Sequence, residues 1–163
     1  MSPLGPSGPD IRPHRPKDDE AILAAYREAI AEGRSFPPSE PPTMERMHEV
    51  WLKDKSIVLT AELEGLVAGC CYVQPNFPGR ARRIANAGYL VAGWARGRGV
   101  GKALLDRSLE EAKRLGFRAM MFNLVFEDNP ARRLWEAAGF EVIGRIPQAV
   151  DDRQDALIYF REL

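Results

Sequence analysis

Three glycines at alternate positions, Gly97, Gly99 and Gly101, lie in the stretch WARGRGVGKALL over residues 94–105. An apolar pattern with helical spacing follows them directly. Glycine is a poor helix former, but it adopts positive φ angles readily and lets another group approach the backbone closely. The N-terminus of a helix also carries unpaired N–H groups and a partial positive charge, which suit an anion. The stretch therefore predicts an anion site at the start of a helix.

Two nucleotide-binding motifs do not fit this stretch. A P-loop requires a glycine five residues before Gly101 and a hydroxyl residue after the lysine, where the chain has Arg96 and Ala103. A dinucleotide-binding fingerprint requires a glycine three residues after its second glycine, where the chain has Lys102 or Leu104. A turn that binds nothing would carry its glycines at a cost of about 0.5–1 kcal/mol each. We therefore favour a ligand site over a purely structural turn.

The segment RGRGVGKALL resembles the pyrophosphate loop of the acetyl-CoA-dependent N-acetyltransferases of the GNAT superfamily. Arg96, Gly99 and Gly101 match the signature Arg/Gln-x-x-Gly-x-Gly/Ala of that loop. A second family element is NLVFEDNPARRLWEAAGFEVIGRIP, a strand followed by an asparagine near a helix start, an aromatic residue and Ala-Gly-Phe. The segment QPNFPGRARRIANAGYLV further resembles a branch of the family with a Pro-Asn-x-Pro-Gly-Arg loop. The resemblance covers nearly all of residues 11–163.

The resemblance implies that the anion is the pyrophosphate of acetyl-CoA, which binds as a co-substrate. Backbone N–H groups of residues 96–102 would hold it, and Arg98 and Lys102 would add positive charge. The pantetheine arm would lie along the strand GYLV, where Leu90 and Val91 offer backbone contacts. The implied cofactor-binding residues are Leu90, Val91, Arg96, Gly97, Arg98, Gly99, Val100, Gly101, Lys102, Asn123, Asn129 and Trp135.

Three of these positions have alternative roles. Asn129 matches a family asparagine that contacts the cofactor arm, but the spacing to Trp135 is one residue shorter than is common in the family, so Asp128 competes for the role. Asn129 also fits a helix cap. Asn123, inside an apolar strand, either lines the cofactor cleft or pairs with backbone across a gap between strands. Trp135 fits a packing role in the core equally well.

Acetyl transfer to an amine requires the amine to be neutral. Deprotonating a lysine-like amine of pKa ~10.4 at pH 7 costs about 5 kcal/mol, so a carboxylate or a water relay usually assists. Relatives often place an acidic base on the strand before the loop, where this chain has Asn86, which cannot take a proton. We expect water held by Asn86 to replace the base. Glu62 and Glu127 are the next carboxylates to consider.

The departing thiolate benefits from a proton donor. Many family members carry a tyrosine for this purpose in the short last helix, where this chain has Trp135, and an indole N–H is not a practical acid. Tyr159, on a closing strand, is the best remaining phenol, although a tyrosine at such a position is more often structural. Asn86 and Tyr159 are therefore the candidate catalytic residues.

The acceptor side of the site carries weaker signals. The loop FPPSEPP over residues 36–42 occurs where relatives shape the acceptor pocket. Arg80, Arg82 and Arg83 either bind an acidic acceptor or form a solvated loop. No acidic or peptide-groove composition is evident, so we expect the acceptor to be a small-molecule amine rather than a protein terminus. We expect direct transfer of the acetyl group in a ternary complex. A CoA-binding regulatory or sensing domain without catalysis is the alternative, because the usual tyrosine and acidic base are both missing.

The composition is that of an ordinary globular domain. Of the 163 residues, 45% are hydrophobic and 28% are charged, and the net charge of zero argues against nucleic acid or an anionic membrane as partner. Two histidines and the adjacent Cys70 and Cys71 give no metal-ligand spacing, so no metal is expected. The start MSPLGPSGPD lacks the features of a signal peptide, and no apolar run reaches transmembrane length. We expect a cytoplasmic monomer or homodimer.

These residues need a scaffold of strands and helices. Residue patterns predict strands over IRPHRP, SIVLTAEL, LVAGCCYVQ, IANAGYLV, RAMMFNLVF, FEVIGRI and DALIYFREL. Glu64 and Gly65 form a predicted hairpin turn. Four helices are predicted. The first runs from Pro16 to Gly33, and the second follows Thr43 as its cap. The third runs from the glycine stretch to Gly116, and the fourth covers NPARRLWEAAG.

The predicted elements and the resemblance together indicate an α/β fold. We expect a GNAT-type mixed, partly parallel central sheet of six or seven strands, with about four helices on its faces. Residues 1–10 are expected to form a disordered N-terminal lead, and residues 11–163 a single N-acetyltransferase domain of this type.

Overall fold

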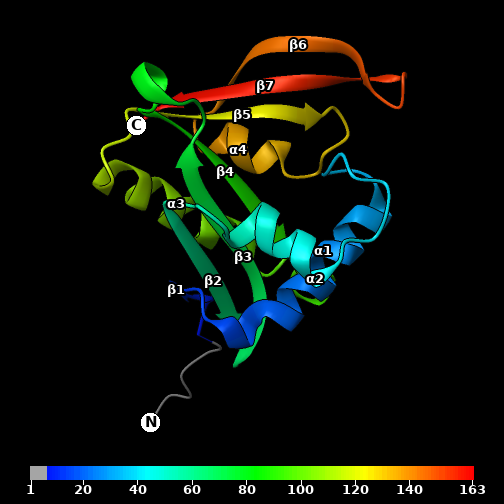
Figure 1. The fold of residues 1–163 in the computed structure, drawn as a ribbon, viewed down its shortest axis with the longest axis vertical. Coiled ribbons are helices and arrows are strands. Elements are labelled where there is room, and N and C mark those ends of the chain that lie inside the picture. Colours follow the sequence, from blue (N-terminus) through cyan, green and yellow to red (C-terminus); the bar gives the residue numbers. More distant parts are fainter. Residues whose placement is uncertain (1–6) are drawn as a thin grey trace.

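The computed structural model describes residues 7–163 (Figure 1). Within them, one seven-stranded sheet has the order β1-β2-β3-β4-β5-β7-β6. Its strands are β1 (Asp10–Pro13), β2 (Ile57–Leu63), β3 (Leu66–Pro75), β4 (Ile84–Val91), β5 (Ala119–Phe126), β6 (Glu141–Val150) and β7 (Gln154–Glu162). Neighbours are antiparallel except β4 and β5, which are parallel. The predicted mixed sheet is confirmed, while most of the lead expected over residues 1–10 lies outside the described residues.

The described residues form four α-helices, as predicted. They are α1 (Asp19–Glu32), α2 (Met44–Met47), α3 (Val100–Arg114) and α4 (Arg132–Ala137), with short helical turns at η1 (Pro16–Asp18), η2 (His48–Leu52), η3 (Gly79–Ala81) and η4 (Gly93–Ala95). On one face of the sheet, α1 and α2 pack over a core that includes Trp51 and Leu90. On the opposite face, α3 and α4 pack over a core that includes Leu105 and Phe122. The sheet is therefore the middle of three layers (Figure 1).

Local signals end helices and form turns where the sequence predicts them. Gly33 ends α1 in the left-handed conformation, with a φ of 70°. The Oγ1 atom of Thr43 accepts a hydrogen bond from the Arg46 N–H at 3.1 Å and caps α2. Glu64 and Gly65 have φ angles of 54° and 78° and form the hairpin turn between β2 and β3.

Two helices are shorter than predicted. The second helix is α-helical only to Met47 and continues as the π-helical η2, which buries Trp51. The last helix begins at Arg132 with Ala131 as its N-cap, rather than at Pro130 with Asn129 as its N-cap. The reason is a turn before it, in which the Oδ1 atom of Asn129 accepts a hydrogen bond from the Ala131 N–H at 2.9 Å.

The parallel strands β4 and β5 pair along only a short part of their length. The paired residues are Ile84 with Ala119 and Ala85 with Met120. At the next position a side-chain hydrogen bond takes the place of main-chain pairing: the Nδ2 atom of Asn86 donates to the Met121 carbonyl at 3.1 Å. Beyond Asn86 the two strands separate, and the sheet has a gap towards their carboxyl ends.

Candidate functional site

A cavity of about 560 Å³ occupies the gap between β4 and β5, a size typical of small-molecule and cofactor sites. Its lining comes from α1 and the following loop (Ala29, Glu32, Ser35, Phe36, Pro37), β3 (Tyr72), β4 (residues 86–91), the glycine loop (residues 95–97 and 99–102), β5 (residues 122–125) and the α4 region (residues 129–131, Leu134, Trp135). Because α1 and α4 lie on opposite faces of the sheet, the cavity passes through the sheet.

The glycine loop forms one end of this cavity, which we call the cofactor end (Val91 and residues 95–97 and 99–102). Gly97 and Gly99 have φ angles of 73° and 84°, which residues with side chains rarely adopt. Among residues 7–163, no acceptor receives a hydrogen bond from the N–H groups of residues 97–102; the next N–H, of Ala103, donates to the Gly99 carbonyl at 3.0 Å. Free N–H groups at the start of a helix, together with the helix dipole, suit an anion.

The cations of the glycine loop are paired with carboxylates. The pairs are Arg96–Glu32 (2.5 Å), Arg98–Glu64 (2.5 Å) and Lys102–Asp106 (2.6 Å), and every side chain in them is more than a third exposed. Such exposed pairs contribute about 0–1 kcal/mol each, so a phosphate competes effectively for the cations. Arg96 and Lys102 line the cavity, whereas Arg98 does not.

The predicted pantetheine strand borders the gap. Leu90 and Val91 line the cavity, and the edge of β4 that faces β5 is unpaired beyond Ala85. A Cβ atom built on Gly101 would lie 3.4 Å from Leu134 and 3.8 Å from Val91. A side chain at Gly101 would therefore project into the space between α3, β4 and α4.

Trp135 and Asn129 both line the cavity from the α4 region. The Trp135 ring is 8% exposed and packs against Phe122, with ring centroids 4.7 Å apart, and against Tyr159, at 5.8 Å. The Oδ1 atom of Asn129 is committed to the turn before α4, so its Nδ2 atom is the group left for a ligand. Both residues thus combine a structural contact with a place on the cavity wall.

The opposite end of the cavity, which we call the acceptor end, consists of Phe36, Pro37, Tyr72, Asn86 and Gly88. Tyr72 lies opposite Gly88 in the β3–β4 ladder. A Cβ atom on Gly88 would lie 2.5 Å from the Tyr72 ring, so only glycine lets this ring lie against β4. Because the Nδ2 atom of Asn86 is used by the Met121 carbonyl, its Oδ1 atom is the one left for a ligand.

Tyr72 is a site residue that sequence reasoning missed. Among the described residues its phenol has no hydrogen-bond partner, and burial raises the pKa of Tyr72 to about 12. The phenol is therefore neutral at pH 7 and free to donate a hydrogen bond into the cavity. Strand alternation in LVAGCCYVQ is the signal that could have identified it, since Tyr72 points to the opposite face from Cys71 and Val73.

Asn123 lines the cavity from β5, and its amide is paired with a side chain rather than with backbone. Its Nδ2 atom donates to Asn76 Oδ1 at 2.6 Å, and Asn76 Nδ2 donates to Asn123 Oδ1 at 2.9 Å. This reciprocal pair ties β5 to the chain that follows β3. It accounts for an amide within an otherwise apolar strand.

Tyr159, the phenol predicted as an acid, does not reach the cavity. It is fully buried beneath α4, and its hydroxyl accepts from Arg132 Nε at 2.8 Å and donates to Glu136 Oε1 at 2.7 Å. Burial raises the pKa of Tyr159. The geometry supports a packing role for this tyrosine and not proton transfer to a ligand in the cavity.

The carboxylates considered from the sequence also lie elsewhere. Glu62 on β2 pairs with Arg12 at 2.9 Å, and Glu127 pairs with Arg145. Neither of them lines the cavity. Among the described residues, Glu32 is the one carboxylate in the cavity lining. The acceptor end therefore has no carboxylate within the described part of the chain.

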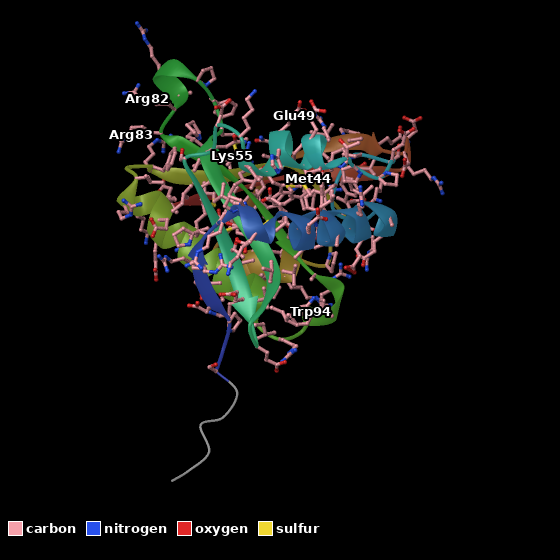
Figure 2. The ribbon with its side chains drawn as sticks, turned by 60° about the horizontal axis from the view of Figure 1, so that its bottom comes forward. Met44, Glu49, Lys55, Arg82, Arg83 and Trp94 are labelled. Carbon is pink, nitrogen blue, oxygen red and sulfur yellow. The ribbon has the colours of Figure 1, made fainter. Side chains whose placement is uncertain are left out.

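The arginines of the β3–β4 loop do not line the cavity. Figure 2 shows Arg82 and Arg83 at the opposite end of the molecule from Trp94, which belongs to η4 beside the glycine loop. The Nη1 atom of Arg82 donates to the Gly79 carbonyl at 3.1 Å, within the same loop. Arg80, Arg82 and Arg83 are all absent from the cavity lining that the structure describes. The solvated loop is the alternative that this position favours.

Within residues 7–163, no group of three or more His, Cys, Asp or Glu side chains is placed to hold a metal ion. Cys70 and Cys71 are free and buried, and burial raises the pKa of each thiol. None of the helices in the described range has the length and apolar character needed to cross a membrane.

The chain is similar in sequence and structure to known proteins. The sequence model of the acetyltransferase (GNAT) family matches residues 23–140. A GCN5-related N-acetyltransferase from Kribbella flavida has a TM-score of 0.89 and 34% identity, over 96% of this chain and 98% of that one. A GNAT superfamily phosphinothricin acetyltransferase from Sinorhizobium meliloti, in complex with AcCoA, has a TM-score of 0.84 and 26% identity, over 96% and 89%.

Curated relatives differ in how much of their length this chain matches. The putative phosphinothricin acetyltransferase YwnH of Bacillus subtilis is 30% identical over 156 residues, which cover 90% of this chain and 94% of that protein. The N-acetyltransferase aca1 of Schizosaccharomyces pombe is 43% identical over 82 residues, half of this chain. The chain spans only 39% of the length of aca1 and 18% of the length of Protein SPT10 of Saccharomyces cerevisiae.

Proposed function

The chain belongs to the acetyltransferase (GNAT) family, and we propose that it transfers the acetyl group of acetyl-CoA to a primary amine of a small molecule. The observation that carries the proposal is the cavity, which connects a preformed anion site to a separate aromatic end through the gap in the sheet. A long cofactor that binds by its phosphates at the cofactor end would reach the acceptor end through this gap. Such a layout supports direct transfer in a ternary complex.

The residues of the cofactor end fit acetyl-CoA. The free N–H groups of residues 97–102 would bind the pyrophosphate, and Arg96 and Lys102 would exchange their carboxylate partners for phosphate oxygens. The unpaired edge of β4 beyond Ala85 offers N–H and C=O groups to the amides of the pantetheine arm. When bound, acetyl-CoA supplies an acetyl group activated as a thioester. The relative from Sinorhizobium meliloti, solved with AcCoA, supports this assignment.

We assign to Asn86 the role of binding the acceptor amine. Its remaining acceptor, Oδ1, would hold either the amine N–H or a water molecule that takes the proton. An amide does not titrate, so the protein itself would not lower the cost of deprotonating the amine, about 5 kcal/mol at pH 7 for a lysine-like pKa. Acceptors with a lower pKa should therefore react faster.

Tyr72 is the hydrogen-bond donor that we assign to the reacting end of the cofactor. Its phenol is neutral, has no partner among the described residues, and lies against β4 at Gly88. A hydrogen bond from this phenol would stabilise negative charge as it develops on the departing sulfur. Trp135 would remain a packing residue on the other side of the gap.

Two measurements test the proposed function. Calorimetry should show acetyl-CoA binding at micromolar concentrations in the presence of a metal chelator, and a thiol-release assay should show turnover that depends on an added primary amine. Binding without turnover across a broad amine panel would contradict an enzyme and favour a regulatory CoA-binding domain. Turnover only with peptides that carry a free N-terminus would contradict the small-molecule acceptor.

A further inference from the structure

The acceptor end is backed by a cluster of four aromatic side chains from four different elements. They are Tyr26 of α1, Phe36 of the following loop, Trp51 of η2 and Tyr72 of β3, and we call them the aromatic wall. Neighbouring rings meet edge to face, with centroids 5.3–5.6 Å apart and interplanar angles of 71–87°. Tyr26 and Trp51 are buried, while Phe36 and Tyr72 line the cavity. The two buried rings therefore hold the two partly buried, cavity-lining rings in place.

Charged side chains on the described cavity wall are confined to the vicinity of the glycine loop. They are Glu32, Arg96 and Lys102. The two cations belong to the glycine loop itself, and Glu32 is paired with Arg96 at 2.5 Å. The acceptor end instead offers aromatic carbon, the amide of Asn86 and the neutral phenol of Tyr72.

Lys55 is a charged side chain that packs on the cavity-lining part of the aromatic wall, at Tyr72, and it lies outside the cavity. Its Nζ atom is 4.9 Å from the centroid of the Tyr72 ring and donates to the Lys53 carbonyl at 3.2 Å. It does not line the cavity, so an acceptor at this end would not contact it directly. A carboxylate, phosphinate or phosphate on the acceptor would thus lose its water without gaining a cation.

We propose that the acceptor is a primary amine whose body is uncharged and apolar, with an aromatic ring or a similar apolar group packed on Phe36 and Tyr72. This inference rests on the proposed function, because it assigns the amine to the end of the cavity opposite the cofactor. Apolar area gives the binding energy, and Asn86 Oδ1 orients the amine. Amino acids with anionic side chains, such as phosphinothricin, fit this end poorly.

The test is amine binding to the protein saturated with CoA, which lacks an acetyl group and so prevents turnover. Calorimetric titrations with 2-phenylethylamine and with phosphinothricin compare an apolar body with an anionic one on the same primary amine group. We expect 2-phenylethylamine to bind at least about tenfold more tightly. Equal or tighter binding of phosphinothricin, or no binding of 2-phenylethylamine at millimolar concentration, would overturn the inference.

Two variants locate the binding site. Phe36→Leu keeps apolar volume but removes the ring, and should weaken 2-phenylethylamine binding about fivefold. Phe77→Leu, on the β3–β4 loop and 39% exposed, makes the same change away from the cavity and should leave the affinity unchanged. Equal affinities in the two variants would show that the aromatic wall does not bind the acceptor.

The same experiments separate this inference from the proposed function. If CoA does not bind, the proposed function fails, and the two amines are then compared in the absence of CoA by the same criterion. If acetyl-CoA is turned over with phosphinothricin but not with 2-phenylethylamine, the proposed function stands and the apolar acceptor is wrong.

Discussion

The two ends of the cavity are built in different ways. The cofactor end is made mainly of backbone: the N–H groups of residues 97–102, two glycines with positive φ, and the start of α3. The acceptor end comes from the loop after α1, from β3 and from β4, and the buried rings of Tyr26 on α1 and Trp51 on η2 lie behind it. One end is continuous in sequence, and the other exists only after folding.

This difference explains what each end can recognise. Backbone N–H groups at a helix start suit a phosphate whatever the neighbouring side chains are, so we expect the cofactor end to be generic. Aromatic and amide side chains present a particular shape and polarity, so we expect the acceptor end to be selective. Substitutions should accordingly act on cofactor affinity at one end and on acceptor turnover at the other.

The largest effect is expected from Gly99→Glu at the cofactor end. The new carboxylate would lie beside the pyrophosphate site, and like charges 4 Å apart oppose each other by about 4 kcal/mol at an effective dielectric constant near 20. We expect acetyl-CoA affinity, measured by calorimetry, to fall at least about 100-fold. Gly116→Glu is the matched control, since Gly116 has a similar φ (90° against 84°) at the other end of α3. Equal affinities in the two variants would mean that the glycine loop does not bind the cofactor.

Tyr72→Phe should give the next largest effect, and it should appear in turnover. A hydrogen bond to a charged group is worth about 1.5–3 kcal/mol, so losing the phenol should lower kcat about tenfold or more. Acetyl-CoA affinity should stay within about twofold. Tyr26→Phe removes a phenol from the same aromatic wall without changing the cavity lining, and should leave kcat unchanged. If both variants keep the parent kcat, Tyr72 is a packing residue only.

Asn86→Ala should lower kcat about fivefold at pH 7, the value of one neutral hydrogen bond of about 1 kcal/mol. Its acetyl-CoA affinity should remain close to that of the parent, because Asn86 lies at the acceptor end of the gap. Steady-state kinetics with saturating acetyl-CoA gives both values. A kcat that matches the parent would show that Asn86 only joins β4 to Met121.

The pH profile of kcat distinguishes water held by Asn86 from a carboxylate base. With no titrating base, the rate should rise with pH towards the pKa of the acceptor amine. Burial raises the pKa of Tyr72 to about 12, so its phenol keeps its proton below that pH and the profile should show no fall up to about pH 11. A plateau that begins near pH 5 would indicate a carboxylate instead. Asn86→Asp adds such a base but loses the N–H that binds the Met121 carbonyl.

Trp135→Phe should have the smallest effect. The ring remains packed between Phe122 and Tyr159, and only the indole N–H and part of the ring are lost. We expect kcat and acetyl-CoA affinity within about threefold of the parent. A decrease in kcat of about 100-fold, the range of proton-transfer groups, would instead give Trp135 a direct part in the chemistry.

Much of the fold and the cofactor end could be predicted because their signals are local. Glycines at positive φ, the Thr43 cap and the Glu64–Gly65 turn act within a few residues of themselves. The insertion of β7 between β5 and β6 could not be predicted, because strand order depends on pairing between distant segments.

The positions of two tyrosines could not be predicted for the same reason. Tyr159 pairs with Phe122 across β5 and β7, on the α4 side of the sheet, and the sequence does not specify that register. Tyr72 was missed because its importance depends on the absence of a side chain at Gly88, in the neighbouring strand. Both positions are defined by contacts between strands rather than by a motif within one.

The short pairing between β4 and β5 also affects how the molecule resists unfolding. The sheet consists of two blocks, β1–β4 and β5–β7–β6, and in the described residues the ladder between them has two residue pairs. The Asn86 side chain and the Asn76–Asn123 pair add hydrogen bonds between the blocks. A cofactor in the gap would contact both blocks and so link them. Any ligand that binds only the folded state adds to its stability, by about 2.7 kcal/mol at 100 times its Kd. In the proposed enzyme, the cofactor would thus hold the two blocks of the sheet in register.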